Sequence, residues 1–222
     1  MAKCQFDSRV DEITNNLVSL YEAHSNGYDL VQGEAWYPEA RRIVNEWAVT
    51  YGYHPETVAC VIAAISSQCP WPRNLIIADD ILARRYPSIG AIKVNIAKAE
   101  ALRDDKLTEK HDYQFSGVCR RMREAFPTGP KVNNFAQNLA GDNAVVTVDT
   151  HAMQAALNDV KSTYTLKWAP YNVFARCYVD AAKRIGRAPA EFQAIIWHTW
   201  KRLNPPASKR NKRRQWEVIG EY

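Results

Sequence analysis

Apolar residues recur along nearly the whole chain at the three- and four-residue spacing of amphipathic helices, rather than at the two-residue spacing of strands. One apolar stripe ends at Gly27, and a second runs from about Tyr37 to Gly52. The apolar segment 57–65 predicts a buried helix, and segment 66–72 interrupts it because two closely spaced prolines do not continue a helix. Further helices are expected over residues 73–85, 88–101, 114–125, 131–140, 170–186 and 188–203.

One short run departs from this pattern. Residues 144–148 (Ala-Val-Val-Thr-Val) form the single clearly β-like stretch, and Asp149 directly after them is placed to cap the N-terminus of the next helix. One extended run among roughly nine helices predicts an all-α protein.

The composition is that of a soluble globular protein. The chain has 222 residues, of which 46% are hydrophobic and 24% charged, enough for one large domain or two lobes that share a core. No apolar run approaches the roughly 20 residues of a membrane helix, and the N-terminus lacks the apolar core of a signal peptide. We therefore expect a cytoplasmic protein without a membrane partner.

Cysteine spacing argues against thiolate-bound metals. The five cysteines form neither a Cys-x-x-Cys pair nor a cluster, and they lie at positions 4, 60, 69, 119 and 177. We therefore expect reduced thiols and no cofactor, in particular no iron–sulfur cluster.

Positive charge gathers at the C-terminal end. The net charge is +5, and residues 207–222, which include Lys209 and Arg210, account for +3 of it. Such a run either contacts nucleic-acid phosphates or forms a solvated tail, and composition alone gives these interpretations equal weight.

Two local patterns could carry chemistry. In Pro127-Thr128-Gly129-Pro130-Lys131, a glycine-bearing turn precedes a helix N-terminus, whose N–H groups and positive dipole end attract phosphate. Taken alone, an ordinary turn between helices is the commoner explanation. Asp149 is equally open, because a carboxylate at a helix start is either a catalytic group or a plain cap.

The combination of these patterns resembles a known family. Lys131 begins a helix after the turn, and Asp149 lies 18 residues downstream in Val148-Asp149-Thr150-His151. This arrangement resembles the helix-hairpin-helix (HhH-GPD) DNA glycosylase superfamily, of the endonuclease III-like type. Segment 64–68 (Ala-Ile-Ser-Ser-Gln) resembles the family segment that fills the gap left by a flipped base. Three further segments resemble bacteriophage-encoded members that lack an iron–sulfur cluster, namely 36–40, 71–74 and 193–197.

The resemblance implies a two-lobed glycosylase fold with its active site in the cleft between the lobes. One lobe, a helical barrel, would span about residues 55–145, and the second would combine residues 1–54 and 146–206, followed by the basic tail 207–222. The implied partner is double-stranded DNA with a damaged or modified base, bound by a monomer in the cytoplasm, or in the host cytoplasm if the chain is phage-encoded.

The resemblance also assigns roles to residues. The catalytic pair would be Lys131 and Asp149. The DNA-binding residues would be Gln68, Thr128, Gly129, His151, Lys209 and Arg210. The base pocket would include Trp36, Tyr37, Trp71 and Asn74.

The chemistry is consistent with this pairing. A stacked base hides its glycosidic bond, so the enzyme must extrude the nucleotide. Replacing the base with an amine needs an uncharged lysine, which a helix N-terminus and partial burial favour over the ammonium. The resulting Schiff base permits strand scission by β-elimination, while the Asp149 carboxylate would stabilise positive charge developing on the sugar.

Three alternatives remain open. The same fold could modify a base substituent in phage DNA without removing the base. The chain could instead be a catalytically silent DNA-binding module that uses its hairpin and tail. A purely structural helical protein is the third alternative, and it leaves the Lys131–Asp149 spacing unexplained.

Overall fold

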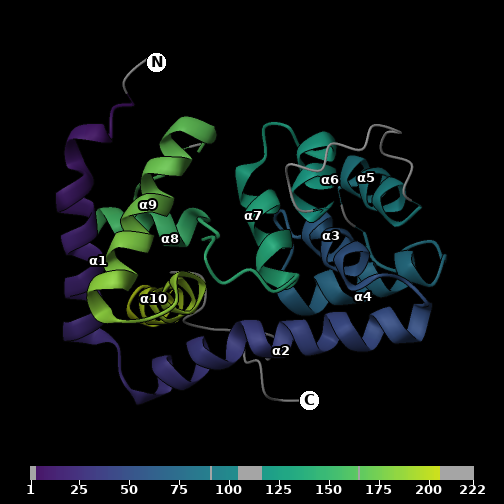
Figure 1. The fold of residues 1–222 in the computed structure, drawn as a ribbon, viewed down its shortest axis with the longest axis horizontal. Coiled ribbons are helices and arrows are strands. Elements are labelled where there is room, and N and C mark those ends of the chain that lie inside the picture. The colour runs from purple at the N-terminus through teal and green to yellow at the C-terminus, as the bar shows by residue number, and fades with distance from the viewer. Residues whose placement is uncertain (1–3, 91, 105–116, 165, 206–222) are drawn as a thin grey trace. The chain divides into compact units, whose positions relative to one another are not determined.

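The computed structural model describes residues 4–90, 92–104, 117–164 and 166–205, and within these ranges the protein is all-helical (Figure 1). The prediction of an all-α protein is therefore confirmed. None of the described helices combines the length and apolar content that crossing a bilayer demands. The elements are η1 (Asp7–Arg9), α1 (Val10–His24), α2 (Gly27–Tyr51), α3 (Pro55–Ile65), α4 (Trp71–Leu82), α5 (Lys93–Arg103), α6 (Gly117–Ala125), α7 (Pro130–Leu139), α8 (Thr150–Leu157), α9 (Trp168–Ile185) and α10 (Pro189–Leu203).

The chain forms two compact units. The inserted unit is Ala40–Gly141, and the terminal unit comprises the described residues within Met1–Glu39 and Asp142–Arg214. The resemblance places the lobe boundaries at about residues 55 and 145, whereas the first boundary of the units falls inside α2. The second half of α2 belongs to the inserted unit because Arg41 Nε donates to the Asn138 carbonyl oxygen (2.9 Å) and the Tyr51 hydroxyl donates to Asp79.

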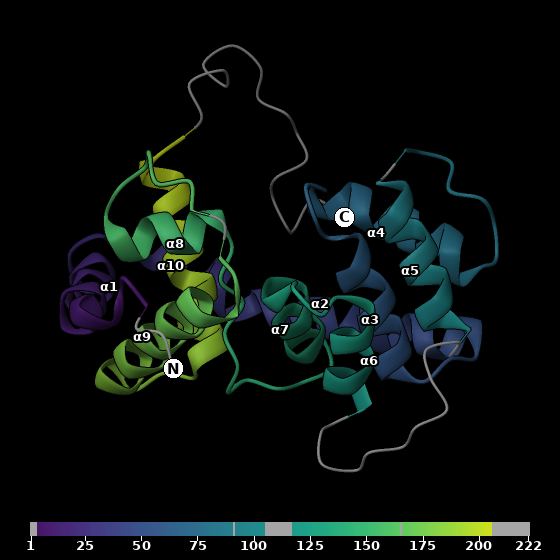
Figure 2. The same ribbon diagram turned by 90° about the horizontal axis from the view of Figure 1, so that it is seen from above.

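In the inserted unit, α3 is the central helix. Every residue from Thr57 to Ile65 is buried, and α4, α5, α6 and α7 pack around it (Figure 2). Asn74 fastens α4 to α3, because its Nδ2 donates to the Ile62 carbonyl oxygen (3.1 Å). The apolar run read from the sequence as a buried helix is therefore the centre of this unit.

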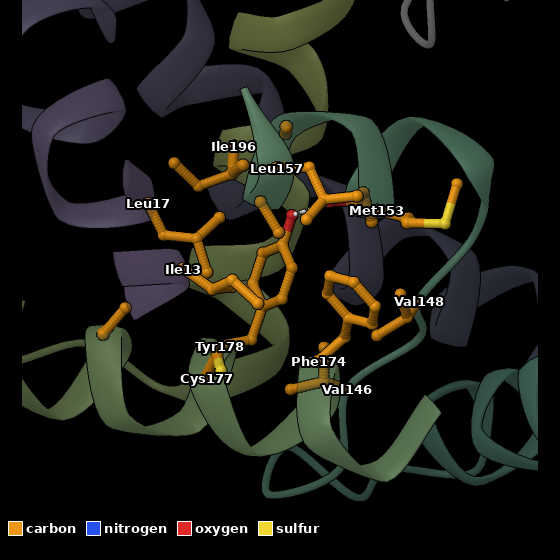
Figure 3. Packing of buried hydrophobic residues seen from close by; sticks show 14 of the residues in the cluster. Ile13, Leu17, Val146, Val148, Met153, Leu157, Phe174, Cys177, Tyr178 and Ile196 are labelled. Carbon is orange, nitrogen blue, oxygen red and sulfur yellow. Dashed lines mark hydrogen bonds between the residues drawn. The ribbon is translucent and has the colours of Figure 1, made fainter. Parts of the chain in front are cut away.

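In the terminal unit, α1, α8, α9 and α10 enclose an apolar core (Figure 3). Its buried residues include Ile13, Leu17, Val146, Val148, Met153, Leu157, Phe174, Tyr178 and Ile196. Trp200 is also buried, whereas Trp47 in the inserted unit is half-buried against Tyr51.

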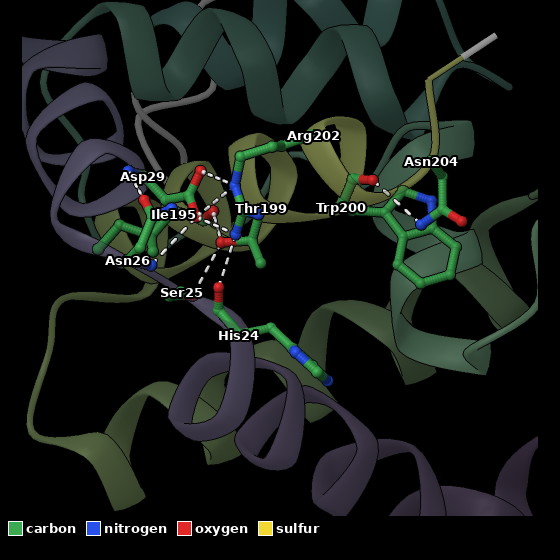
Figure 4. Close-up of polar contacts among 9 residues, drawn as sticks. All are labelled: His24, Ser25, Asn26, Asp29, Ile195, Thr199, Trp200, Arg202 and Asn204. Atoms are coloured by element: carbon green, nitrogen blue, oxygen red, sulfur yellow. Dashed lines mark hydrogen bonds and ion pairs between the residues drawn. The ribbon is translucent and has the colours of Figure 1, made fainter.

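An ion pair between the exposed Arg202 and the buried Asp29 joins the end of α10 to the start of α2 (Figure 4). The Asp29 carboxylate is fully buried and accepts hydrogen bonds from Arg202 Nε (3.1 Å) and Nη2 (2.7 Å). Burial acts to raise the pKa of Asp29, but the hydrogen bonds from Arg202 and from the Asn26 backbone outweigh it, so this pKa lies below its ordinary value.

Within the terminal unit, α2 and α10 touch at Gly33. A Cβ added to Gly33 would lie 2.4 Å from Ile195 Cγ1 and 2.6 Å from the Ile195 Cα and backbone nitrogen. Carbon atoms in contact normally sit about 3.5–4.0 Å apart, so only glycine fits between these helices.

The predicted start of α2 is wrong. The helix begins at Gly27 rather than near Tyr37, and Pro38 lies inside it. Asn26 and Asp29 cap this start reciprocally, because the Asn26 N–H donates to Asp29 Oδ2 (3.1 Å) and the Asp29 N–H to Asn26 Oδ1 (3.0 Å). Helix α4 likewise begins at Trp71, because Pro72 occupies the first turn, where its missing N–H has no helical partner to lose.

The expected extended run at 144–148 does not form a strand. Its backbone is held instead by one side chain of α9. The Tyr171 hydroxyl donates to the Val146 carbonyl oxygen (2.9 Å) and accepts from the Val148 N–H (3.0 Å). Because the hydroxyl supplies both partners at this point, the segment needs no neighbouring strand.

Candidate functional site

The turn before Lys131 is built around backbone carbonyls. Gly129 is the N-cap of α7, and its N–H donates to the Phe126 carbonyl oxygen (3.0 Å). The buried Asn133 side chain donates to that same oxygen (3.0 Å) and to the Gly129 carbonyl oxygen (2.8 Å). Asn133 therefore stabilises the turn formed by residues 126–129. The sequence analysis did not identify this role.

Gly129 is needed at this turn for space rather than for backbone freedom. Its φ of −106° is accessible to any residue. A Cβ there would lie 3.0 Å from Val132 Cγ2 and 3.2 Å from Phe126 Cβ. Thr128 beside it is exposed, which suits its expected role as a DNA contact.

Lys131 is half-buried in the first turn of α7. Its Nζ lies 3.5 Å from the carbonyl oxygen of Ser66, the C-cap of α3. The Ser66 hydroxyl is buried and has no hydrogen-bond partner among the described residues. This contact brings the Lys131 hairpin and the turn after α3 together within the inserted unit.

Gln68 lies on that turn, two residues after Ser66. It is exposed and has a φ of 55°, in the left-handed region that non-glycine residues rarely adopt. This conformation costs about 1 kcal/mol for a residue with a Cβ. An exposed side chain on a strained turn is the kind of outlier that marks functional positions.

The residues that follow Gln68 include a thiol influenced by two basic side chains and a tryptophan. Burial raises the pKa of the Cys69 thiol, while the charges of Arg73 and Lys131 act to lower it. Trp71 is half-buried and packs edge-on against Phe135, with ring centroids 6.2 Å apart.

Asn74, also expected in the base pocket, is buried against α3. Its Nδ2 has the Ile62 carbonyl as partner, whereas its Oδ1 is buried without a hydrogen-bond partner among the described residues. The contact observed for Asn74 therefore joins α4 to α3.

Asp149 lies in the terminal unit and caps α8, as its position in the sequence predicts. Its Oδ1 accepts a hydrogen bond from the Ala152 N–H (2.8 Å). Its Oδ2 accepts one from the Trp197 indole Nε1–H on α10 (3.0 Å). Asp149 as a whole residue is half-buried.

Trp197 itself is surrounded by basic side chains. Lys201 Nζ lies 3.9 Å from the centre of the indole ring. The His151 ring packs edge-on at 6.2 Å, and the His198 ring lies at 5.2 Å. Burial, reinforced by the charge of Lys201 and opposed by Asp29, lowers the pKa of His198 to about 4.

The aromatic pair on α2 also belongs to the terminal unit. Tyr37 is buried, and its hydroxyl donates to Gln193 Oε1 (3.3 Å) on α10. Trp36 is half-buried, and its ring centroid lies 6.3 Å from that of Tyr37. The observed contact of Tyr37 is with the interior of its unit.

The predicted site residues therefore divide between the units. The inserted unit contains Lys131, Gln68, Thr128, Gly129, Trp71 and Asn74. The terminal unit contains Asp149, His151, Trp36 and Tyr37. Lys209 and Arg210 lie outside the described residues. Across the described ranges, no group of three or more His, Cys, Asp or Glu side chains could hold a metal ion.

A half-buried lysine at a helix start, an exposed glutamine with a left-handed backbone and a carboxylate held by two donors are thus present in this chain. No curated protein matches the chain, and no solved structure matches it either. Residues 2–204 match a family described as "Family of unknown function (DUF7178)", and the chain belongs to that family.

Proposed function

We propose that this protein is a DNA glycosylase with abasic-site lyase activity, in which Lys131 attacks the sugar C1′ of an extruded nucleotide. One observation carries the proposal. The Lys131 Nζ lies 3.5 Å from the Ser66 carbonyl oxygen, on the turn that exposes Gln68.

Base flipping explains why these residues would lie together. A side chain that fills the vacated space in the duplex and an amine that attacks the extruded sugar must act on the same nucleotide. Ser66 and Lys131 are 65 residues apart in the sequence, yet they are in contact. The exposure and left-handed backbone of Gln68 suit a side chain that points away from the protein into a partner.

The reaction balances with the groups present. The Lys131 amine forms a bond to C1′ as the bond from C1′ to the base nitrogen breaks, and the base leaves with a proton. The second amine proton moves to the ring oxygen O4′ as the bond between C1′ and O4′ breaks, which opens the sugar ring and gives an imine. Removal of a C2′ proton then expels the 3′ phosphate and cuts the strand.

Asp149 would supply negative charge near the sugar. Positive charge develops on the sugar as the base departs, and a fixed carboxylate lowers the energy of that state. Thr128 would contact the DNA backbone, and Trp71 of the same unit as Lys131 would offer a half-buried aromatic face to the extruded base.

Borohydride trapping tests the proposal. Labelled duplexes would carry an abasic site, uracil, 5-hydroxymethyluracil, oxidised guanine or a mismatch, and each would be incubated with the wild type, Lys131→Gln or Lys98→Gln. Lys98 is a matched control, because it is also half-buried in the inserted unit and contacts the hairpin through the Phe126 ring (4.1 Å). We expect an adduct with the wild type and Lys98→Gln but none with Lys131→Gln.

Other outcomes would redirect the assignment. An adduct that persists in Lys131→Gln refutes the role of this lysine. Intact strands that carry a base of altered mass would indicate a base-modifying enzyme. Tight duplex binding without either product would indicate a silent DNA-binding module.

A further inference from the structure

We infer that Trp197 is a positioning residue that fixes the Asp149 carboxylate for the reaction, and that Lys201 strengthens this contact. The inference rests on the proposed function, because it assigns Trp197 to the same step as Asp149. Its basis is the hydrogen bond from the indole Nε1–H to Asp149 Oδ2 (3.0 Å).

Helix capping alone does not require this hydrogen bond. An N-cap aspartate satisfies the first turn of its helix with a single oxygen, and Oδ1 already does so through the Ala152 N–H. The second oxygen is bound by a residue 48 positions away on another helix. The two bonds together fix the plane of the carboxylate, whereas a cap by itself leaves the second oxygen free to turn.

The indole suits this task because it is a donor that has no acceptor atom. The indole N–H can therefore fix the position of Oδ2, and the indole has no atom that could accept a proton in competition with the carboxylate. An ionised carboxylate has about four acceptor positions, so two remain for a reacting group after Ala152 and Trp197 are bound.

The indole is itself held in place. Gly33 and Ile195 bring α10 into direct contact with α2, and Gln193, one turn before Trp197, accepts a hydrogen bond from Tyr37 (3.3 Å). The Lys201 ammonium lies over the ring face at 3.9 Å, and it draws electron density from the ring. This withdrawal makes the indole N–H a stronger donor to Asp149.

Kinetics of an abasic-site duplex test the inference. Trp197→Phe keeps a ring under Lys201 but removes the N–H. We expect kcat for strand scission to fall about 10- to 100-fold, the equivalent of one hydrogen bond to a charged group, with KM nearly unchanged. Lys201→Gln should lower kcat about 2- to 5-fold. Trp47→Phe, which removes a half-buried indole from the inserted unit, should leave both constants unchanged.

A spectroscopic readout is independent of activity. The indole N–H proton resonance of Trp197 is identified by its loss in Trp197→Phe. In Asp149→Asn it should move upfield and exchange faster with water, because the amide that replaces the carboxylate is a weaker acceptor. This resonance stays unchanged if the hydrogen bond is absent, and that result would overturn the inference.

The two proposals fail in different ways. Wild-type scission together with normal kcat in Trp197→Phe would overturn the inference and leave the glycosylase proposal intact. If Trp197→Phe raised KM and left kcat unchanged, the indole would serve in binding rather than in positioning Asp149. That result would also overturn the inference. A wild type that neither traps nor cleaves any duplex would overturn both.

Discussion

Replacing Gly33 with alanine should destabilise the terminal unit, although the same change inside an ordinary helix is stabilising. Alanine is favoured over glycine in helix interiors by about 0.5–1 kcal/mol. At Gly33, however, the new methyl group would lie 2.4–2.6 Å from three atoms of Ile195, two of which are backbone atoms. A backbone cannot rotate away as a flexible side chain can.

The size of the effect follows from these distances. Normal carbon–carbon contact is about 3.5–4.0 Å, so α10 would have to retreat by at least about 1 Å. That movement would pull on the hydrogen bonds that Asp29 and Tyr37 make to α10. Overpacking of this kind costs about 3 kcal/mol, which outweighs the gain in helix propensity. For a chain of this length, the midpoint of thermal unfolding would fall by about 6–12 °C.

Urea unfolding followed by circular dichroism measures the change, and Gly27→Ala is the matched control. Gly27 begins the same helix, and nothing lies within 4 Å of a Cβ added there. This control should be neutral or stabilising by about 0.5 kcal/mol. The reasoning fails if Gly33→Ala unfolds at the same urea concentration as the wild type or as Gly27→Ala.

Three further predictions concern other parts of the chain. Gln68→Gly should be about 1 kcal/mol more stable than Gln68→Ala in urea unfolding, because only glycine relieves the left-handed strain; equal stabilities would show that there is no strain. The pKa of His198 is about 4 in the fold and about 6.5 in an unfolded chain. The unfolded chain therefore binds the proton more readily, and wild-type stability should fall as the pH drops from 6.5 to 4, by at most about 1.4 kcal/mol per pH unit. His198→Gln should flatten this slope, and an unchanged slope would mean that another group titrates. Tyr171→Phe removes partners from two buried backbone groups, so it should cost about 2–4 kcal/mol and accelerate hydrogen exchange at the Val148 amide; exchange at the wild-type rate would contradict this account.

Helix positions could be predicted where apolar residues are dense or recur at helical spacing. Segment 57–65 is an example, since its dense apolar run corresponds to α3 at the centre of the inserted unit. The first ten residues of α2 were not predicted to be helical because they include two glycines, and their start depends on a reciprocal cap between Asn26 and Asp29. The sequence did not indicate that glycine is required at position 33, because this requirement comes from contact with a second helix that is distant in sequence.

The candidate site shows the same limit. Asp149 as an N-cap could be predicted because capping is local. Its second partner, Trp197, could not, because a contact across 48 residues leaves no periodic trace. The contact between Lys131 and Ser66 is similarly a product of packing within the inserted unit. Local motifs thus suggested candidate side chains, whereas tertiary contacts among the described residues determine what holds them.

The Tyr171 hydroxyl has a consequence for how this family can vary. A β-strand would tie the segment before Asp149 to a register, in which a shift of one residue turns every side chain to the opposite face. A single hydroxyl group instead holds Val146 and Val148 at one point, on a rigid ring rooted in α9. Insertions and deletions upstream, around the exposed residues 141–144, would then be absorbed before they reach Asp149. Loop length can therefore diverge among relatives while the carboxylate keeps its place.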